Sequence, residues 1–374
     1  MRILLLGELS GVHQELAPAL KALGHIVVVG HSRLAQPEFK SDIDFARPSF
    51  DRGPRMEAFR DIMSQLYNAP KLTGFDVVQV ITPKFFNWKI HGPMMRFLKR
   101  HNRKMVVISA SCSSDYYRRV QELNYRPCKE CLQFDQKSDR CVFDRPQEQQ
   151  AEYAAYDAAD AIVATHFEYS FALHDTRFAG KLVNIPLPID TVRHRQSPMP
   201  PLDKLRIWYG ETRYGFKGSH FILPALDRLQ SGPLGDGVEI LRTGRLAFDE
   251  YLDLLSTVHI AIDQASSYSM GMNALYPLAR GRVVLSGAEP EMLDFVRVSS
   301  SDNPIVNVRP DVDQIHDTLV DLIGRKADLP DLGQKSAAYV ERFHSARKIA
   351  LAYLSLYSTL INETTKTPEM DVSE

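Results

Sequence analysis

The stretch YGETRYGFKGSHFILPAL combines two cations and three glycines between a short apolar run and a segment of helical apolar periodicity. Arg213 and Lys217 stand four residues apart, Gly210 permits a sharp turn, and Gly218 leads into the periodic segment. A helix that begins near Ser219 would add free N–H groups and a partial positive charge. We therefore predict a site for a polyanion such as a diphosphate. The alternative is a solvated basic loop.

A second glycine loop, GELSGVHQEL, follows the first apolar run of the chain. Its glycines, Gly7 and Gly11, are spaced G-x-x-x-G, and His13 follows where a third glycine would be expected. This spacing disfavours a dinucleotide site and with it an oxidoreductase. A helix N-terminus at this loop could hold a polar ligand through backbone N–H groups, and a plain strand-to-helix turn is the alternative.

All four cysteines of the chain lie in one loop, residues 112–146. Cys128 and Cys131 form a C-x2-C pair, the spacing of two tetrahedral zinc ligands, and Cys141 could supply a third. Cys112 could complete the zinc site or belong to a cleft. We predict a structural zinc in this loop, with buried or free thiols as the alternative. A redox pair is disfavoured because the C-x2-C does not open a helix of a thioredoxin-like unit.

Residues 84–104 combine Phe85, Phe86 and Trp88 with many Lys, Arg and His residues. Interleaved basic and aromatic residues on a helix are typical of attachment to an anionic membrane surface. A helix that covers a sheet and turns a cationic edge to solvent is the alternative. The N-terminal residues have no signal-peptide pattern, and no apolar stretch approaches the roughly 18 to 20 residues of a membrane span. We expect a cytoplasmic protein, with this segment able to contact the inner face of the membrane.

The elements that must position these motifs alternate between strands and helices. Continuous apolar runs at Leu4 to Leu6, Val77 to Ile81 and Ala161 to Ala164 are typical of parallel strands buried on both faces. The same pattern restarts after a segment rich in proline near residues 184–203. We therefore predict an α/β fold of two Rossmann-like, doubly wound domains that face each other across a cleft. Ligands should bind at the carboxyl ends of the strands.

The chain has 374 residues and a net charge of -1, which allows two domains and argues against a nucleic-acid partner. We place the first domain at residues 1–190, a linker at 191–203 and the second domain at 204–343. A helix at 344–362 would cross back to the first domain. The polar residues 363–374 are expected to be a disordered tail.

Several of these segments together resemble retaining GT-B glycosyltransferases of the group 1, family 4 type. GETRYGFKGSHFILPAL resembles the Arg and Lys-Gly loop that follows the first strand of the family's second domain. VHIAIDQASSYSMGMNALYPLARGRVVLSG resembles its strand, glycine loop and helix, and SGVHQELAPALKALGH resembles its first glycine loop. YVERFHSARKIALAYLSLY resembles its closing helices, which implies C-terminal helices that pack back on the first domain.

The resemblance implies transfer of a sugar from a nucleotide-diphosphate sugar to a hydroxyl of a glycan or lipid-linked acceptor. The expected pathway is the synthesis of surface polysaccharide or glycoconjugates. Arg213 and Lys217 would stabilise the leaving diphosphate, so that no metal is needed there, and His13 would face the sugar or acceptor. The turn around Gly244 would border the base. The expected donor-binding residues are Gly11, Val12, Gly210, Gly218, Gly244, Gly271, Met272, Asn273 and Tyr276.

The chain departs from the family at two positions. The family carries two glutamates around its last glycine loop, and placing Gly271 on the family glycine puts Tyr268 and Tyr276 at those positions. A tyrosine hydroxyl can bond a ribose, but it does not accept hydrogen bonds as a carboxylate does. A nucleotide-sugar-binding protein that has lost catalysis is therefore the alternative function.

Overall fold

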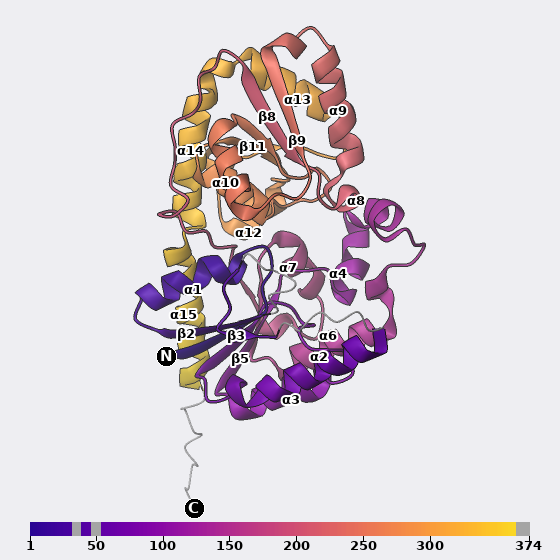
Figure 1. Ribbon diagram of the computed structural model, residues 1–374, viewed down its shortest axis with the longest axis vertical. Helices are drawn as coiled ribbons and strands as arrows, with labels where there is room; N and C mark the ends of the chain where they lie inside the picture. The colour runs from indigo at the N-terminus through magenta and orange to yellow at the C-terminus, as the bar shows by residue number, and fades with distance from the viewer. Residues whose placement is uncertain (32–38, 46–53, 364–374) are drawn as a thin grey trace, which may run out of the picture.

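The structure is a computed structural model that describes residues 1–31, 39–45 and 54–363 (Figure 1). The chain builds two α/β domains, and a long C-terminal helix runs back along the first of them. Every strand pairing in the described sheets is parallel, as the continuous apolar runs predict. Of the predicted disordered tail, residues 364–374 lie outside the described residues.

The sheet of the first domain has seven strands in the order β3-β2-β1-β4-β5-β6-β7. The side chains of Leu4 to Leu6 in the interior strand β1 are fully buried, because helices cover both faces of the sheet. The strands are β1 Arg2–Leu6, β2 Ile26–His31, β3 Ile43–Asp44, β4 Val77–Val80, β5 Lys104–Ser109, β6 Ala161–Ala164 and β7 Leu182–Asn184. The helices are α1 Val12–Ala22, α2 Pro54–Asn68, α3 His91–His101, α4 Ser114–Arg119, α5 Cys128–Glu130, α6 Pro146–Ala158 and α7 Phe167–Leu173.

The second domain has a sheet of five strands in the order β12-β11-β10-β8-β9. The strands are β8 Leu205–Gly210, β9 Val238–Thr243, β10 Ile260–Ile262, β11 Val283–Ser286 and β12 Val306–Asn307. The helices that follow are α8 Tyr214–Lys217, α9 Ser219–Ser231, α10 Phe248–Thr257, α11 Met272–Ala279, α12 Pro290–Val296, α13 Val312–Gly324, α14 Leu329–Phe343 and α15 Ala346–Glu363. The carboxyl ends of these strands point toward the first domain (Figure 1).

One apolar cluster extends through both domains. It joins Leu5 of β1 and Leu16 of α1 to Leu275 of α11, and Tyr353 and Tyr357 of α15 belong to the same cluster. α15 packs against α1, so the C-terminal helix does return to the first domain, as expected. Two separate clusters fill the remaining interior of the first and second domains.

The chain passes between the domains twice, and the two passages are bonded to each other. The amide of Ile189 on the outward passage donates to the carbonyl of His344 at 2.8 Å. The amide of Ala346 donates back to the carbonyl of Ile189, also at 2.8 Å. His344 itself ends α14 before α15 begins, and its Nδ1 donates to the carbonyl of Leu187 at 2.9 Å.

The basic and aromatic segment at residues 84–104 divides into two parts. Phe86 is buried and Phe85 packs against the same core cluster, while Trp88 is 69% exposed. The helix α3 then turns Met95 and Leu98 into the core, so it covers the sheet with a cationic outer edge. The interpretation of the aromatic residues as one membrane-facing helix is therefore wrong for Phe85 and Phe86. No helix in the described part of the chain is both long and apolar enough to span a membrane.

Three buried histidines make the stability of this fold depend on pH. Burial lowers the pKa of His13, His91 and His344 from 6.5 to about 4. Between these values the folded protein binds fewer protons than the unfolded chain, so the stabilisation is complete above pH 6.5 and is lost as the pH falls toward 4. We expect each histidine to make the free energy of unfolding at about pH 5 lower by about 2 kcal/mol than its value at neutral pH, as measured by urea unfolding.

The variant His344→Asn isolates one of these contributions. Asn keeps an N–H donor for the carbonyl of Leu187 but cannot titrate. The free energy of unfolding of this variant should therefore decline less steeply as the pH falls than that of the parent. The difference in slope corresponds to nearly one fewer proton taken up on unfolding. Parallel pH profiles for the two proteins would show that His344 does not titrate on unfolding.

Candidate functional site

The predicted anion loop lines a cavity between the two domains. Arg213 and Lys217 both border this cavity, which has a volume of about 440 Å³. Gly218 has a positive φ of 78°, and a Cβ there would lie 2.5 Å from the hydroxyl of Ser266, so glycine is required where α8 turns into α9. The sequence prediction of a cationic turn before a helix is confirmed in its geometry.

A carboxylate from the first domain holds the anion loop in place. The two oxygens of Asp135 accept the amide hydrogens of Gly215 and Phe216, at 2.9 and 2.8 Å. Gly215 fits closely beneath this segment, because a Cβ there would lie 2.2 Å from the carbonyl oxygen of Glu130. Arg213 adopts the left-handed conformation, with φ of 53°, and its guanidinium stacks 3.7 Å above the ring of Phe216. The position of the arginine thus depends on a segment of the other domain.

Lys217 is oriented by a buried aspartate at the end of β10. The ammonium of Lys217 lies 3.2 Å from Oδ1 of Asp263, whose other oxygen accepts the amide hydrogen of Gly271 at 2.9 Å and the hydroxyl of Ser286 at 3.0 Å. Asp263 is only 2% exposed, and the ion pair with the lysine offsets the cost of burying its charge. Asp263 was not predicted, although a polar residue directly after a buried strand is a signal that could have found it.

The N-terminus of α11 forms the facing wall of the same cavity. Gly271, Met272, Asn273 and Tyr276 all line it, as the resemblance implied. The hydroxyl of Tyr251 donates to the carbonyl of Asn273 at 3.2 Å and fixes the first turn of this helix. Backbone N–H groups of α11 and the cations of the anion loop therefore border one enclosed volume.

Part of the lining of this cavity is aromatic. Trp208, Phe248 and Tyr251 line it together with Gly244, the turn predicted to border the base. Gly210 lies beside the indole, and a Cβ there would be 2.8 Å from the ring of Trp208. The periodicity of residues 248–255 is that of an ordinary amphipathic helix, and periodicity does not show which turn of a helix reaches a cleft. A flat apolar base would find stacking partners here.

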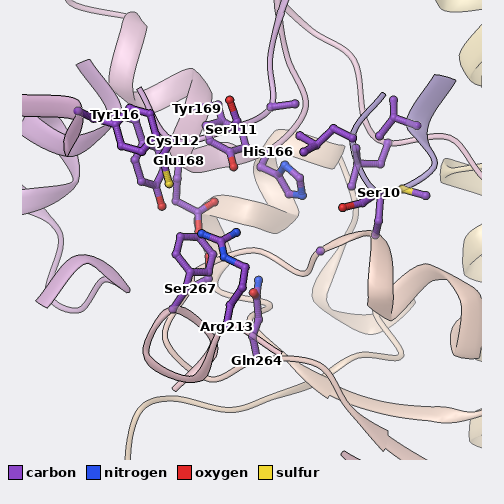
Figure 2. Close-up of a pocket in the computed structure, with 18 residues that line it drawn as sticks. Ser10, Ser111, Cys112, Tyr116, His166, Glu168, Tyr169, Arg213, Gln264 and Ser267 are labelled. Carbon is purple, nitrogen blue, oxygen red and sulfur yellow. The ribbon is translucent and has the colours of Figure 1, made fainter. Parts of the chain in front are cut away.

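A second cavity of about 280 Å³ adjoins the first on the side of the first domain. Figure 2 shows its labelled polar side chains, with the guanidinium of Arg213 pointing toward Glu168 of α7. The carboxylate of Glu168 accepts the hydroxyls of Ser267 and Ser269, at 2.5 and 2.6 Å. Val12 also lines this cavity, as predicted for a residue facing the sugar or acceptor side. The residues shared by the two cavities are Ser10, Arg213, Phe216, Gln264, Gly271 and Met272.

The first glycine loop differs from the expectation that its backbone N–H groups are open to a ligand. The carboxylate of Glu8 accepts the amide hydrogens of Leu9, Gly11 and Gln14, at 2.7, 3.1 and 2.9 Å. Burial raises the pKa of Glu8 to about 7, against the lowering effect of these hydrogen bonds. The helix N-terminus of α1 is thus capped by the chain itself. Gly11 contacts the other domain instead, since a Cβ there would lie 2.6 Å from the hydroxyl of Tyr276.

His13 does not face the cleft, which corrects its assignment as a catalytic residue. Its ring is fully buried, and Nδ1 donates to the carbonyl of Gly7 at 2.7 Å. Nε2 accepts a hydrogen bond from the side-chain amide nitrogen of Gln79 at 3.1 Å. The hydroxyl of Tyr357 donates to the side-chain oxygen of the same Gln79. Burial lowers the pKa of His13 to about 4, which keeps the ring neutral as this chain of hydrogen bonds requires. His13 links α15 to the glycine loop.

The two tyrosines at the family's glutamate positions both contact the first domain. Tyr268 stacks between Tyr125 and Phe167, with ring centroids 4.7 and 5.8 Å away, and its hydroxyl accepts the amide hydrogen of Asn124. Tyr276 lines the larger cavity and points its hydroxyl toward Glu15, 3.5 Å away. Residues that bind substrate in the family type therefore hold the domains together in this chain.

The four cysteines all lie close to the anion loop and carry free thiols. The amide of Gln136 lies 3.6 Å from the sulfur of Cys131 and 3.7 Å from that of Cys141. Cys112 lines the smaller cavity, where burial raises the pKa of its thiol, and Cys128 packs against the same apolar cluster as Cys112. Within the described ranges, no group of three or more His, Cys, Asp or Glu is arranged to hold a metal ion. The zinc site stays a prediction without support from this geometry.

Comparisons with known proteins give structural likeness and no sequence match. No protein-family model and no curated protein sequence matches the chain. Sucrose-phosphate synthase from Thermosynechococcus elongatus is similar in structure, with a TM-score of 0.66 at 17% identity, over 97% of this chain and 100% of that one. HepE of Anabaena in complex with UDP and glucose has a TM-score of 0.61 at 12% identity, over 96% and 100% of the two chains.

UDP-GlcNAc 2-epimerase from Neisseria meningitidis bound to UDP-GlcNAc is also similar, with a TM-score of 0.57 at 12% identity. The likeness covers 96% of this chain and 100% of that one. At these identities the comparisons establish the fold and nothing finer. The chain has the GT-B fold that its sequence predicts, with two Rossmann-like domains facing each other across a cleft.

The close approach of Gly11 to Tyr276 can be tested with a matched pair of variants. Gly11 and Gly24 both have a positive φ, 94° and 86°, so alanine is strained by about 1 kcal/mol at either position. Only at Gly11 would the new Cβ meet another group, because nothing lies within 4 Å at Gly24. We expect Gly11→Ala to lower the free energy of urea unfolding by about 2 kcal/mol more than Gly24→Ala.

The double variant Gly11→Ala with Tyr276→Phe provides the control. Removing the hydroxyl opens the space that the Cβ needs, so most of the additional loss should be recovered. Purely additive losses in the double variant would mean that the contact between the two domains is not responsible.

Proposed function

We propose that the protein is a glycosyltransferase that moves a sugar from a nucleotide-diphosphate sugar to a hydroxyl of a glycan or lipid-linked acceptor, with retention of configuration. The pathway that we propose is the synthesis of surface polysaccharide or glycoconjugates. The observation that carries the proposal is the convergence of Arg213, Lys217 and the N-terminus of α11 on one cavity between the domains. Two cations and a helix N-terminus match the charge of a diphosphate better than that of a single carboxylate.

The two adjoining cavities suggest how the substrates are arranged. The larger one is lined by aromatic side chains that would stack on a base and by the cations of the anion loop that would bind the diphosphate. The smaller one is lined by polar side chains of the first domain and would take the acceptor. Arg213, Gly271 and Gln264 border both cavities, so the bond to be broken would lie beside them. Uridine is the first base to test, since HepE was solved with UDP and the epimerase with UDP-GlcNAc.

In this reaction the anomeric carbon gains positive character while the diphosphate leaves with growing negative charge. The main electrostatic task is therefore to stabilise the leaving group. Lys217 is suited to it because Asp263 holds the ammonium at the cavity wall, and Arg213 because Asp135 and the Phe216 ring fix its loop. These protein cations would supply the charge that a metal supplies in other enzymes, so we propose chemistry that requires no metal.

A nucleotide-sugar-binding protein without catalysis is the second candidate function. It is favoured by one observation, namely that Tyr268 and Tyr276 stand in place of the family's glutamates and contact the first domain. Thermal shift with UDP, GDP and ADP, followed by transfer assays with the corresponding sugar donors and varied acceptors, separates the two candidates. Binding with transfer supports the enzyme, binding without transfer supports the binding protein, and failure to bind any nucleotide contradicts both.

The roles of the two cations are tested by Arg213→Gln and Lys217→Ala. We expect each variant to lower the turnover number by about 100-fold to 1000-fold, because each removes charge from the leaving group. Arg213 is an exposed residue, so the variant Arg213→Gln should unfold at the same temperature as the parent protein. Lys217→Ala also leaves Asp263 without its ion pair, so its stability must be measured alongside its activity.

Lys204→Ala is the matched control for the two cation variants, since Lys204 is exposed and lies outside both cavities. It should leave turnover and nucleotide affinity unchanged. Parent-like turnover in Arg213→Gln or Lys217→Ala would remove that side chain from the proposed mechanism.

A further inference from the structure

Helix α2 exposes its apolar side chains and buries polar ones. Met56, Phe59, Met63, Leu66 and Tyr67 are exposed by 46%, 58%, 49%, 45% and 77%. Their positions recur at three or four residues, so they form one stripe along the helix. A surface helix of a globular protein normally turns such a stripe toward the core. In α2 this arrangement is inverted.

The buried side of α2 explains this orientation, because it is held by polar contacts. Gln65 is 6% exposed and accepts the backbone amide hydrogen of Asn87 at 2.9 Å, while Asn68 is 4% exposed and its side-chain amide donates to the carbonyl of Asp44 at 3.5 Å. The side-chain amide of Asn87 also donates to the carboxylate of Asp61 of α2 at 2.9 Å. Rotating the helix to bury its apolar stripe would break these bonds and leave buried polar groups unsatisfied. The apolar stripe is therefore held outward.

A sixth exposed apolar side chain belongs to the segment that is bonded to α2. Trp88 is 69% exposed and follows Asn87, which is bonded to α2 at two positions. We call Met56, Phe59, Met63, Leu66, Tyr67 and Trp88 the α2 surface. A contiguous apolar patch of this kind on a globular domain marks an interaction site.

Two lysines border the α2 surface and sit against its aromatic rings. The ammonium of Lys71 lies 5.4 Å from the ring centroid of Tyr67, and that of Lys89 lies 5.6 Å from the centroid of Trp88. Neither ammonium forms an ion pair with a carboxylate of the described residues. An aromatic ring at the boundary of an apolar surface, with a lysine beside it, is the arrangement found where proteins meet lipid headgroups.

We propose that the α2 surface binds an anionic lipid bilayer, with the apolar side chains at the level of the acyl chains and Lys71 and Lys89 at the headgroups. Charge favours this partner over a second copy of the chain, because a two-fold pairing would bring the lysines of both copies onto one interface. The site differs from the membrane contact predicted for residues 84–104, since only Trp88 of its three leading aromatic residues is exposed. The inference does not depend on the proposed activity.

Vesicle sedimentation with the full chain tests the proposal. Vesicles of phosphatidylcholine mixed with an equal part of phosphatidylglycerol should bind the protein, and pure phosphatidylcholine vesicles should bind it more weakly. Added salt should weaken binding to the anionic vesicles, because it screens the lysines. The double variant Phe59→Ser and Met63→Ser should lower the partition coefficient by about tenfold or more, since both side chains lose apolar area that would enter the bilayer.

Two controls make the result specific to the α2 surface. Val192→Ser with Leu351→Ser also removes two exposed apolar side chains, 83% and 48% exposed, and should leave binding unchanged. Phe59→Leu with Met63→Leu keeps the apolar character and should retain binding. Unchanged thermal unfolding would show that the serine variant is folded.

Two outcomes would overturn the proposal. One is equal vesicle binding by the parent and the folded serine variant. The other is a parent that stays in solution and sediments as a dimer that the serine variant dissociates, which would assign the α2 surface to a second copy.

Discussion

The bond between the two chain passages is the constraint on which the rest of the structure depends. The amide of Ile189 donates to the carbonyl of His344, and the amide of Ala346 donates to the carbonyl of Ile189, so the outward and the returning chain cross between the domains as one unit. The anion loop and the larger cavity need both domains, because Asp135 of the first domain accepts the amide hydrogens of Gly215 and Phe216 beside Arg213, and Ser10 lines the cavity. A change in the angle at this junction would alter both cavities together.

Close packing between the domains accounts for tyrosines at the two positions where the family that the chain resembles carries glutamates. Tyr268 fills the space between two aromatic rings of the first domain, and the hydroxyl of Tyr276 fits against Gly11 only because that residue has no Cβ. Glu168 supplies a carboxylate from the first domain to the serines of the same loop. The carboxylate that the loop lacks in its own sequence thus reaches it from the other side of the cleft.

The fold was predictable because its signals are local. Parallel strands that are buried on both faces appear in the sequence as continuous apolar runs. The glycines at the anion loop mark positions where the backbone conformation or the close approach of a neighbour disfavours any other residue. Side-chain direction was not predictable. His13 and Val12 are adjacent in sequence, yet one is bonded inside the core and the other lines a cavity. Asp135 was missed because its partners lie about 80 residues away in another domain, and no periodicity encodes that contact.

The same limit applies to the surface. The sequence alone gives the same expectation of membrane contact for Phe85, Phe86 and Trp88. Only the tertiary contacts show that the two phenylalanines pack inside and that the tryptophan is exposed. On α2 the sequence shows an amphipathic helix and leaves open which face is outward. The bonds of Gln65 to Asn87 and of Asn68 to Asp44 decide the matter, because an unsatisfied buried amide costs more than an exposed apolar side chain gains by burial elsewhere. An inverted helix is therefore a property of the fold, and its function is to be sought outside the core.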